Sequence, residues 1–226
     1  FQRELAVKVS LDNSEAVKFA DIVFLCVKPQ QMSALCSELK GCVSKRQLVV
    51  SIAAGLSLSQ VGEWLPQAAI VRLMPNLAVS IGQGVVGVCV GEHGLLVNDM
   101  DFFQIISLWG EVMPLENESQ LAALTVISAS GVAFYCCLSE ILQKAAIDYN
   151  MPLNMVERLV LQTASGAAAL VEENDTAWAD VRVQVTSPGG TTAAALDYMT
   201  AKGVHGAVRE AIDLAVGKAI NINKKD

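Results

Sequence analysis

Short, continuous apolar runs recur along the first half of the chain, and each is followed by a segment with helical spacing. None of the first three runs alternates apolar with polar residues, so each is typical of a strand that is buried on both faces of a parallel sheet. This order of strands and short helices predicts a doubly wound α/β sheet. The predicted strands span 22–27, 47–52, 69–74 and 84–91, and the predicted helices span 30–40, 57–65 (with a Ser57 cap) and 99–110.

The pattern changes near Glu116, and from there to Asn221 no segment has the character of a strand. Small side chains at 164–169 allow two helices to approach closely. An all-helical region rich in apolar residues is a natural dimerisation unit. We therefore predict two domains, an α/β domain at 1–115 and an all-α domain at 116–226. The predicted helices span about 121–149, 153–173, 191–202 and 206–220.

The longest apolar run lies at the start of this helical region, from Val126 to Leu138. It contains two serines and a glycine and ends before Glu140. A bilayer needs about 20 apolar residues in a helix, so the run is too short to span one. We interpret it as a buried helix and expect no membrane partner.

Composition narrows the class of protein. The chain has 226 residues, of which 53% are hydrophobic and 17% charged, and its net charge is −7. So much apolar surface predicts an oligomer interface, and the negative charge without a basic cluster argues against nucleic-acid binding. The six cysteines show no CxxC spacing and mostly lie in apolar runs, where they act as small buried hydrophobes. With only two distant histidines, His93 and His205, we predict no metal site, and thiols that stay reduced inside a cell.

One loop has the composition of an anion site. Thr186 and Ser187 are followed by Pro188, Gly189 and Gly190, and a helical run then begins with two threonines. Proline ends the preceding structure, and glycines allow a tight bend. The next helix would open with unpaired N–H groups and the positive end of its dipole, which suits a carboxylate or a phosphate. An ordinary helix entry capped by threonine explains the same residues equally well.

Three further segments follow predicted strands directly. Val27, Lys28 and Pro29 follow the first strand, Ala53, Ala54 and Gly55 the second, and Pro75 and Asn76 the third. Each could be a plain turn, but together they favour a ligand crevice, because ligands of open α/β sheets bind beyond the carboxyl ends of the strands. A literal G-x-G-x-x-G at 82–87 runs into strand-like sequence rather than a helix, so we do not interpret it as a cofactor loop.

These blocks, in this order, resemble the pyrroline-5-carboxylate reductase family. The resemblance covers Asn13 to about Asn221, and its most specific block is Gln184 to Thr192. It implies a Rossmann-like dinucleotide-binding domain followed by an all-α dimerisation domain, NADPH or NADH as cofactor, and a homodimer with a higher ring oligomer as a further option. Such families carry a strand and a glycine-rich turn before the region matched here, so the resemblance implies that the N-terminal unit of the first domain is missing.

The resemblance also implies roles for particular residues. It places Asn13 at the adenosine ribose of the cofactor and Glu118 on the substrate side. Thr192 would hydrogen bond the ring nitrogen of the substrate and is the candidate catalytic residue. The cofactor-binding residues implied are Asn13, Val27, Lys28, Pro29, Ala53, Ala54, Gly55, Asn76 and Gln184, and the substrate-binding residues are Glu118, Ser187, Gly190, Thr191 and Thr192.

The implied reaction is reduction of the C=N bond of 1-pyrroline-5-carboxylate to L-proline. Departures from the family pattern at Leu77, Ala122 and Ala129 keep two alternatives open, a non-catalytic regulatory paralogue and a reductase of another small imino or hydroxy acid. We expect a cytoplasmic protein, or a mitochondrial one if a transit peptide precedes the chain.

Overall fold

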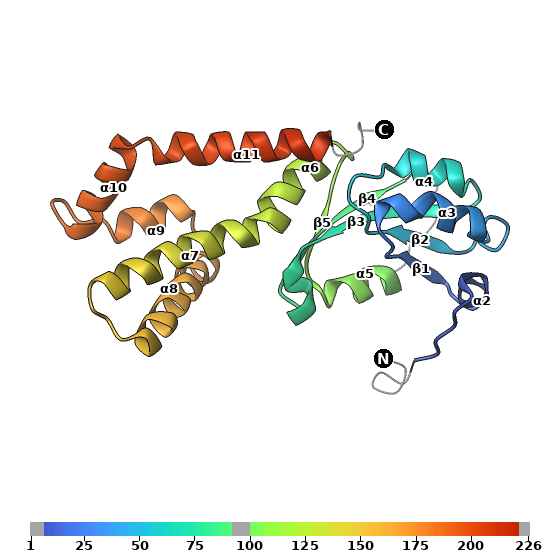
Figure 1. Ribbon diagram of the computed structural model, residues 1–226, viewed down its shortest axis with the longest axis horizontal. Helices are drawn as coiled ribbons and strands as arrows, with labels where there is room; N and C mark the ends of the chain where they lie inside the picture. Colours follow the sequence, from blue (N-terminus) through green and yellow to red (C-terminus); the bar gives the residue numbers. More distant parts are fainter. Residues whose placement is uncertain (1–6, 92–99, 222–226) are drawn as a thin grey trace. The chain divides into compact units, whose positions relative to one another are not determined.

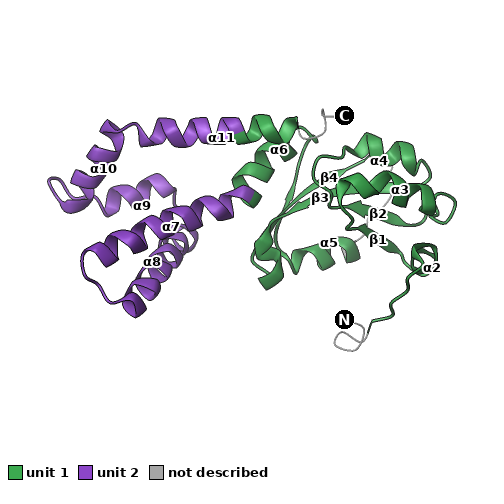
Figure 2. Ribbon diagram, in the orientation of Figure 1, with its two compact units in different colours: residues 1–129, 215–226 green, residues 130–214 purple. Residues whose placement is uncertain are grey.

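The computed structural model describes residues 7–91 and 100–221. The chain forms two compact units, one made of 1–129 with 215–226 and the other of 130–214 (Figure 2). The predicted boundary after residue 115 lies before the end of the first unit. Leu121 and Leu124 explain this, because they pack with Met74 and Cys89 of the sheet.

The first unit is built on one five-stranded sheet with the strand order β1-β2-β3-β4-β5. The first three strands are parallel, β4 is antiparallel to β3, and β5 is parallel to β4. The sheet is therefore mixed: β1, β2 and β3 have the parallel pairing that their apolar runs predict, whereas the antiparallel pairing of β4 with β3 was not predicted. The strands are β1 (Ile22–Leu25), β2 (Leu48–Ser51), β3 (Ala69–Pro75), β4 (Gly84–Val90) and β5 (Gly110–Pro114).

Helices cover both faces of the sheet (Figure 1). On one face, α2 (Asn13–Lys18), α3 (Pro29–Leu39) and α4 (Leu58–Trp64) bury side chains such as Met32, Cys36 and Val61 against the strands. On the other face, α5 (Met100–Ser107) contributes Phe102 and Ile106 to a second core. The continuous apolar character of β2 and β3 follows from this burial on two sides.

Polar side chains fix where two of these helices begin. Asp12 accepts hydrogen bonds from the amides of Ser14 and Glu15 at the start of α2. The hydroxyl of Ser14 and these amides lower the pKa of the Asp12 carboxyl. Ser57 caps α4 and forms a reciprocal capping box with Gln60, as its place in the sequence predicted.

The G-x-G-x-x-G sequence does not form a cofactor loop. Gly82 ends the 3₁₀ helix η1 (Leu77–Ile81) with a φ of 71°, while Gly84 and Gly87 lie in β4. A Cβ on Gly87 would come within 2.8 Å of Leu124, so this glycine allows α6 (Gln120–Leu124) to pack directly on the strand. The interpretation of this segment as a strand is confirmed.

The chain from Glu116 to Asn221 contains no strand, as predicted. One long helical stretch runs from α6 through the π-helical turn η3 (Thr125–Ser130) into α7 (Gly131–Asp148). The predicted helices at 153–173, 191–202 and 206–220 are also present. They are α8 (Leu153–Glu173), α10 (Thr191–Ala201) and α11 (Val204–Ile220), and the short helix α9 (Trp178–Gln184) was not predicted.

The interpretation of 126–138 as a buried helix is wrong for the single chain. Tyr135 is 67% exposed and Leu138 is 51% exposed, although Val126 and Gly131 are buried. The reason is that the second unit has few buried side chains of its own; in α8, for example, only Val156 and Val160 are buried. Among the described residues, the stretch Gln120–Asp148 is long and apolar enough to cross a membrane, judged by length and composition alone.

The cysteines divide into two groups. Cys36 and Cys89 are buried, as small hydrophobes should be, and Cys42 is half-buried. Cys26, Cys136 and Cys137 are exposed, so the expectation of burial fails for them. All six thiols are free.

Candidate active site

The loops that follow the three parallel strands meet at one edge of the sheet. Leu25, Ser51 and Arg72 are aligned across β1, β2 and β3. The segments beyond them therefore emerge side by side. They hold seven of the predicted cofactor-binding residues: Val27, Lys28, Pro29, Ala53, Ala54, Gly55 and Asn76. The structure brings these residues to one place, while their contacts with a cofactor stay a prediction.

The loop after β2 is shaped by its own backbone. Ala53 is buried and its amide donates to the hydroxyl of Ser51 at 3.4 Å. Gly55 has a φ of 85°, which side chains with a Cβ rarely tolerate. Ala54 is exposed next to it. The loop therefore offers a small side chain and bare backbone to a ligand.

The Asn76 side chain stabilises the turn that follows β3. Its side-chain oxygen accepts hydrogen bonds from the amides of Ala78 and Val85, both at 3.2 Å. These two bonds fix the orientation of the side-chain amide. The Nδ2 group has no acceptor among the described residues, so it is free to donate to a ligand.

Asn13 lies apart from these loops. Its side-chain amide donates to Glu38 at 3.2 Å, near the end of α3. Pro29, at the sheet edge, begins the same helix. Nine residues separate them, or roughly 13 Å along the helix axis at 1.5 Å per residue. Only a ligand that extends away from the sheet edge could contact both Asn13 and the loops.

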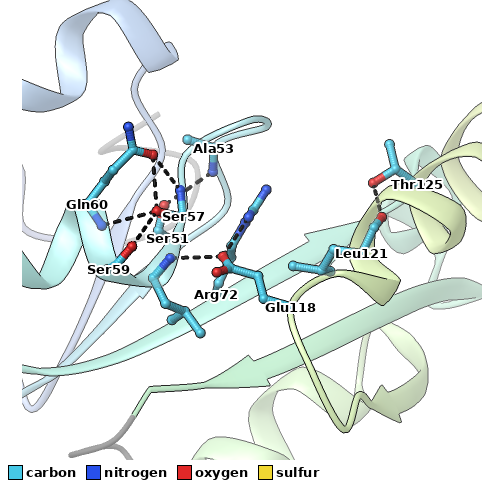
Figure 3. A network of polar contacts seen from close by, with 10 residues as sticks. Ser51, Ala53, Ser57, Ser59, Gln60, Arg72, Glu118, Leu121 and Thr125 are labelled. Carbon is cyan, nitrogen blue, oxygen red and sulfur yellow. Dashed lines mark hydrogen bonds and ion pairs between the residues drawn. The ribbon is translucent and has the colours of Figure 1, made fainter. Parts of the chain in front are cut away.

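An ion pair lies behind the β2 loop (Figure 3). Arg72 of β3 is 9% exposed, and its Nη1 donates to Oε1 of Glu118 at 2.7 Å. The same oxygen accepts a hydrogen bond of 2.8 Å from the amide of Leu58, the first residue of α4. Glu118 thus connects the strand, the start of a helix and the segment before α6.

A cavity of about 370 Å³ opens beside this pair. Arg72 and Glu118 are the charged residues among those that line it. Ala54 and Gly55 of the predicted cofactor loop line it too, and the remaining wall includes Ser57, Met74, Ala122 and Thr125. The cavity is therefore mostly apolar, with one pair of opposite charges.

The second group of predicted residues lies in the other unit, at the start of α10. Gly189 has a φ of 69°, and the amide of Gly190 donates to the carbonyl of Ser187 at 3.0 Å. A Cβ on Gly190 would lie 2.5 Å from the Ser187 hydroxyl. Gly189 therefore has a backbone conformation that favours glycine, and a side chain at residue 190 would displace the Ser187 hydroxyl. Pro188 and Gly189 are exposed, so packing does not cover the bend within the chain.

The bend leaves the start of α10 open. Gly190 is the N-cap and has no side chain to accept the first-turn amides. The amides of Thr191, Thr192 and Ala193 have no acceptor among the described residues. Nor do the hydroxyls of Ser187, Thr191 and Thr192 make hydrogen bonds there. Gln184 is exposed at the end of α9. The start of α10 is thus rich in unpaired donors, as the sequence predicted.

Two other kinds of site, a metal centre and a cysteine nucleophile, were considered among the described residues. The described residues contain no group of three or more histidine, cysteine, aspartate or glutamate side chains that could hold a metal ion. Burial raises the pKa of the Cys89 thiol, and the negative charge of Glu118 raises it further. Cys89 is therefore a neutral thiol rather than a nucleophile.

The fold defines the class of this protein. It is an oxidoreductase with a Rossmann-like domain followed by a helical dimerisation domain. Residues 118–222 match the model described as pyrroline-5-carboxylate reductase dimerisation, and residues 1–55 match a model described as NADP oxidoreductase, coenzyme F420-dependent.

The chain belongs to the pyrroline-5-carboxylate reductase family. It is 36% identical to the pyrroline-5-carboxylate reductase of Pseudomonas aeruginosa over 213 residues, covering 94% of this chain and 78% of the relative. The solved reductase of Coxiella burnetii matches with a TM-score of 0.88 and 30% identity, over 98% of this chain and 83% of that one. The Plasmodium falciparum enzyme, solved with NADP bound, matches with a TM-score of 0.83 and 25% identity, over 93% of this chain and 80% of that one.

Arg72 was not among the predicted site residues, although its place in the sequence carries a signal. An arginine in the middle of an otherwise apolar strand is almost never fully buried unless it is paired. The partner could not be identified from sequence, because Glu118 lies 46 positions further along the chain.

Proposed function

We infer that this protein reduces 1-pyrroline-5-carboxylate to L-proline with NADPH or NADH, which is the last step of proline biosynthesis. The observation that carries the inference at the site is the open start of α10. Three first-turn amides and three hydroxyls there lack partners among the described residues. This is a seat for a small carboxylate, and 1-pyrroline-5-carboxylate is one.

The first unit suits the cofactor. Loops with small or flexible residues follow three parallel strands at one edge, where dinucleotides bind in such sheets. The amide of Asn76, the exposed backbone at Ala54 and Gly55, and the cavity beside them offer both polar and apolar contacts. When bound, the reduced nicotinamide supplies a hydride to the C=N carbon of the substrate.

The residues of the second unit orient the substrate and handle its proton. The open amides of α10 hold the carboxylate, with Ser187 and Thr191 beside it. The Thr192 hydroxyl hydrogen bonds the ring nitrogen of the substrate: it donates to the neutral imine, and its oxygen accepts from the N–H of the protonated form. The second contact stabilises the iminium, which accepts a hydride more readily. No side-chain nucleophile is required, since orientation and polar contacts are the contribution of the protein.

The helical domain is proposed to form a homodimer. Its apolar surface is exposed in the single chain, and a partner chain would cover it. The same explanation accounts for the apolar stretch Gln120–Asp148 without a membrane. A higher ring oligomer, a cytoplasmic location and the absence of a nucleic-acid partner stay predictions.

Replacing Thr192 by Ala tests the mechanism. We expect kcat with 1-pyrroline-5-carboxylate to fall by about 100-fold or more, because general acid catalysis contributes on this scale. The dissociation constant for the cofactor should change little. Steady-state oxidation of NADPH by the full-length protein, followed at 340 nm, measures the first quantity, and calorimetric titration measures the second.

Thr200→Ala is the matched control, because Thr200 lies on the same helix and its hydroxyl donates to the carbonyl of Leu196. It removes the same atoms away from the bend and should leave kcat unchanged. Equal kcat in the wild type and the Thr192 variant would remove Thr192 from the mechanism.

A further inference from the structure

Arg72 is buried with its hydrogen-bonding capacity only partly used. The residue is 9% exposed, and its one bond to a side chain runs from Nη1 to Glu118. Its Nε is fully buried and has no acceptor among the described residues. Leaving a buried donor unsatisfied is unfavourable, so native proteins seldom keep one without a reason.

Glu118 keeps one oxygen free beside this guanidinium. Oε1 accepts from both Arg72 and the amide of Leu58, at 2.7 Å and 2.8 Å. Oε2 has no partner among the described residues. The Glu118 side chain is 27% exposed, and it lines the cavity of about 370 Å³ together with Arg72.

The pair therefore presents a guanidinium and a carboxylate side by side at a wall that is mostly apolar and whose other polar residues, Ser57, Ser119 and Thr125, carry hydroxyl groups. Its net charge is zero, because the two charges neutralise each other. A second carboxylate bound at Arg72 would be repelled by Glu118. A neutral group with one acceptor oxygen and one N–H donor would satisfy both partners, and a primary carboxamide is such a group.

We propose that Arg72 and Glu118 bind the carboxamide of the nicotinamide, its oxygen accepting from the Arg72 guanidinium and its NH₂ donating to Oε2 of Glu118. The cavity borders Ala54 and Gly55, the loop predicted to lie at the nicotinamide. The assignment rests on the proposed function for the presence of the cofactor. It gives Glu118 a cofactor contact in place of the substrate contact that the family resemblance implied.

Binding of two oxidised cofactors to the full-length protein tests the proposal. NADP⁺ carries the carboxamide, whereas its 3-acetylpyridine analogue has a methyl group in place of the NH₂ and keeps the carbonyl oxygen. We expect the wild type to bind NADP⁺ about 10-fold or more tightly than the analogue, because a hydrogen bond to a charged group is lost. Isothermal titration calorimetry gives both dissociation constants without catalysis.

Substitutions of Glu118 and Arg72 test whether these two residues make the contact with the carboxamide. In Glu118→Gln, the amide oxygen stays with Arg72 and Leu58, so an NH₂ faces the ligand and the ratio of the two dissociation constants should fall to about 2 or less. Arg72→Lys should weaken the binding of both ligands by a similar factor, because both retain the carbonyl oxygen. The ratio of the two dissociation constants should therefore stay as in the wild type. Glu116→Gln, the same change at an exposed site two residues away, should leave both constants unchanged.

The outcomes separate this proposal from its rivals. A merely structural role for Glu118 predicts weaker binding of both cofactors with an unchanged ratio, which would overturn the proposal. Equal affinities in the wild type would also overturn it, and this result needs no variant to fold. If NADP⁺ binds with the expected ratio but 1-pyrroline-5-carboxylate does not drive NADPH oxidation, the proposed function fails while the carboxamide contact stands.

Discussion

The position of the Ser187 hydroxyl before α10 depends on the absence of a side chain at Gly190. An added Cβ would lie 2.5 Å from the Ser187 hydroxyl and 3.2 Å from the Ser187 carbonyl oxygen. The hydroxyl can rotate away, and it then leaves its place beside Gly190, the N-cap of α10. A side chain at this position would therefore move the Ser187 hydroxyl rather than undo the bend.

We expect Gly190→Ala to raise KM for 1-pyrroline-5-carboxylate by about 10-fold, which corresponds to the loss of about one hydrogen bond. The midpoint of thermal unfolding should move little. Gly206→Ala is the control, because a Cβ there meets nothing within 4 Å. An unchanged KM in the Gly190 variant would show that the position of Ser187 does not matter to the substrate.

For single residues, the sequence predicts the roles that depend on neighbours close in the chain, such as helix caps and bends. Ser57 and Gln60 lie three positions apart, and the capping box follows from that spacing. The bend at Gly189 and Gly190 follows from residue type in the same way. Arg72 and Glu118 could not be paired, because their contact depends on how β3 and the segment before α6 come together in space.

Among the elements, those with strong periodicity were predicted well. The apolar strands β1, β2 and β3 and the long helix α8 agree with the prediction to within two residues or so. β5 was missed because it is a short strand that begins with glycine, ends with proline and has little buried surface. α9 was missed because seven residues give fewer than two full helical periods.

The long helix α7 has side chains that its own unit does not cover. Tyr135, Leu138 and Ile141 are between 51% and 67% exposed, and they recur every three residues along one side of the helix. In the proposed dimer, a partner chain covers such a surface. A charge placed there would then be buried without a partner, which is strongly unfavourable.

We therefore expect Leu138→Glu to raise the dissociation constant of the dimer by about 100-fold or more. Sedimentation velocity over a range of protein concentrations measures this constant. Leu108→Glu is the matched control, since Leu108 is 76% exposed and lies outside the region matched by the dimerisation model. A dimer that tolerates the Leu138 variant as well as the control would place the interface elsewhere.

On the scale of the whole molecule, the sequence predicted the fold class and the family. The α/β region, the all-helical region and the family were all found from apolar patterns and motif order. The domain boundary after residue 115 stays a prediction; Leu121 and Leu124, which lie beyond it, pack on the sheet. The exposure of apolar side chains on α7 was not predicted. An apolar sequence looks the same whether its side chains are buried within their own chain or by a partner chain.

The two groups of candidate residues belong to different units, and the proposed reaction needs both of them. Cofactor contacts are assigned to the sheet edge and substrate contacts to the start of α10. In the proposed reaction, a hydride passes from a cofactor held by the first group of residues to a substrate held by the second. Neither cofactor binding nor substrate binding alone demonstrates this transfer.

The most direct test is to follow the transferred atom. Full-length protein is incubated with 1-pyrroline-5-carboxylate and NADPH carrying deuterium at the transferable C4 position, and the product is analysed by mass spectrometry and NMR. We expect L-proline with one deuterium at C5, formed in a one-to-one ratio with oxidised cofactor. Cofactor oxidation without labelled proline, or no oxidation by a protein that binds both ligands, would contradict the proposed reaction.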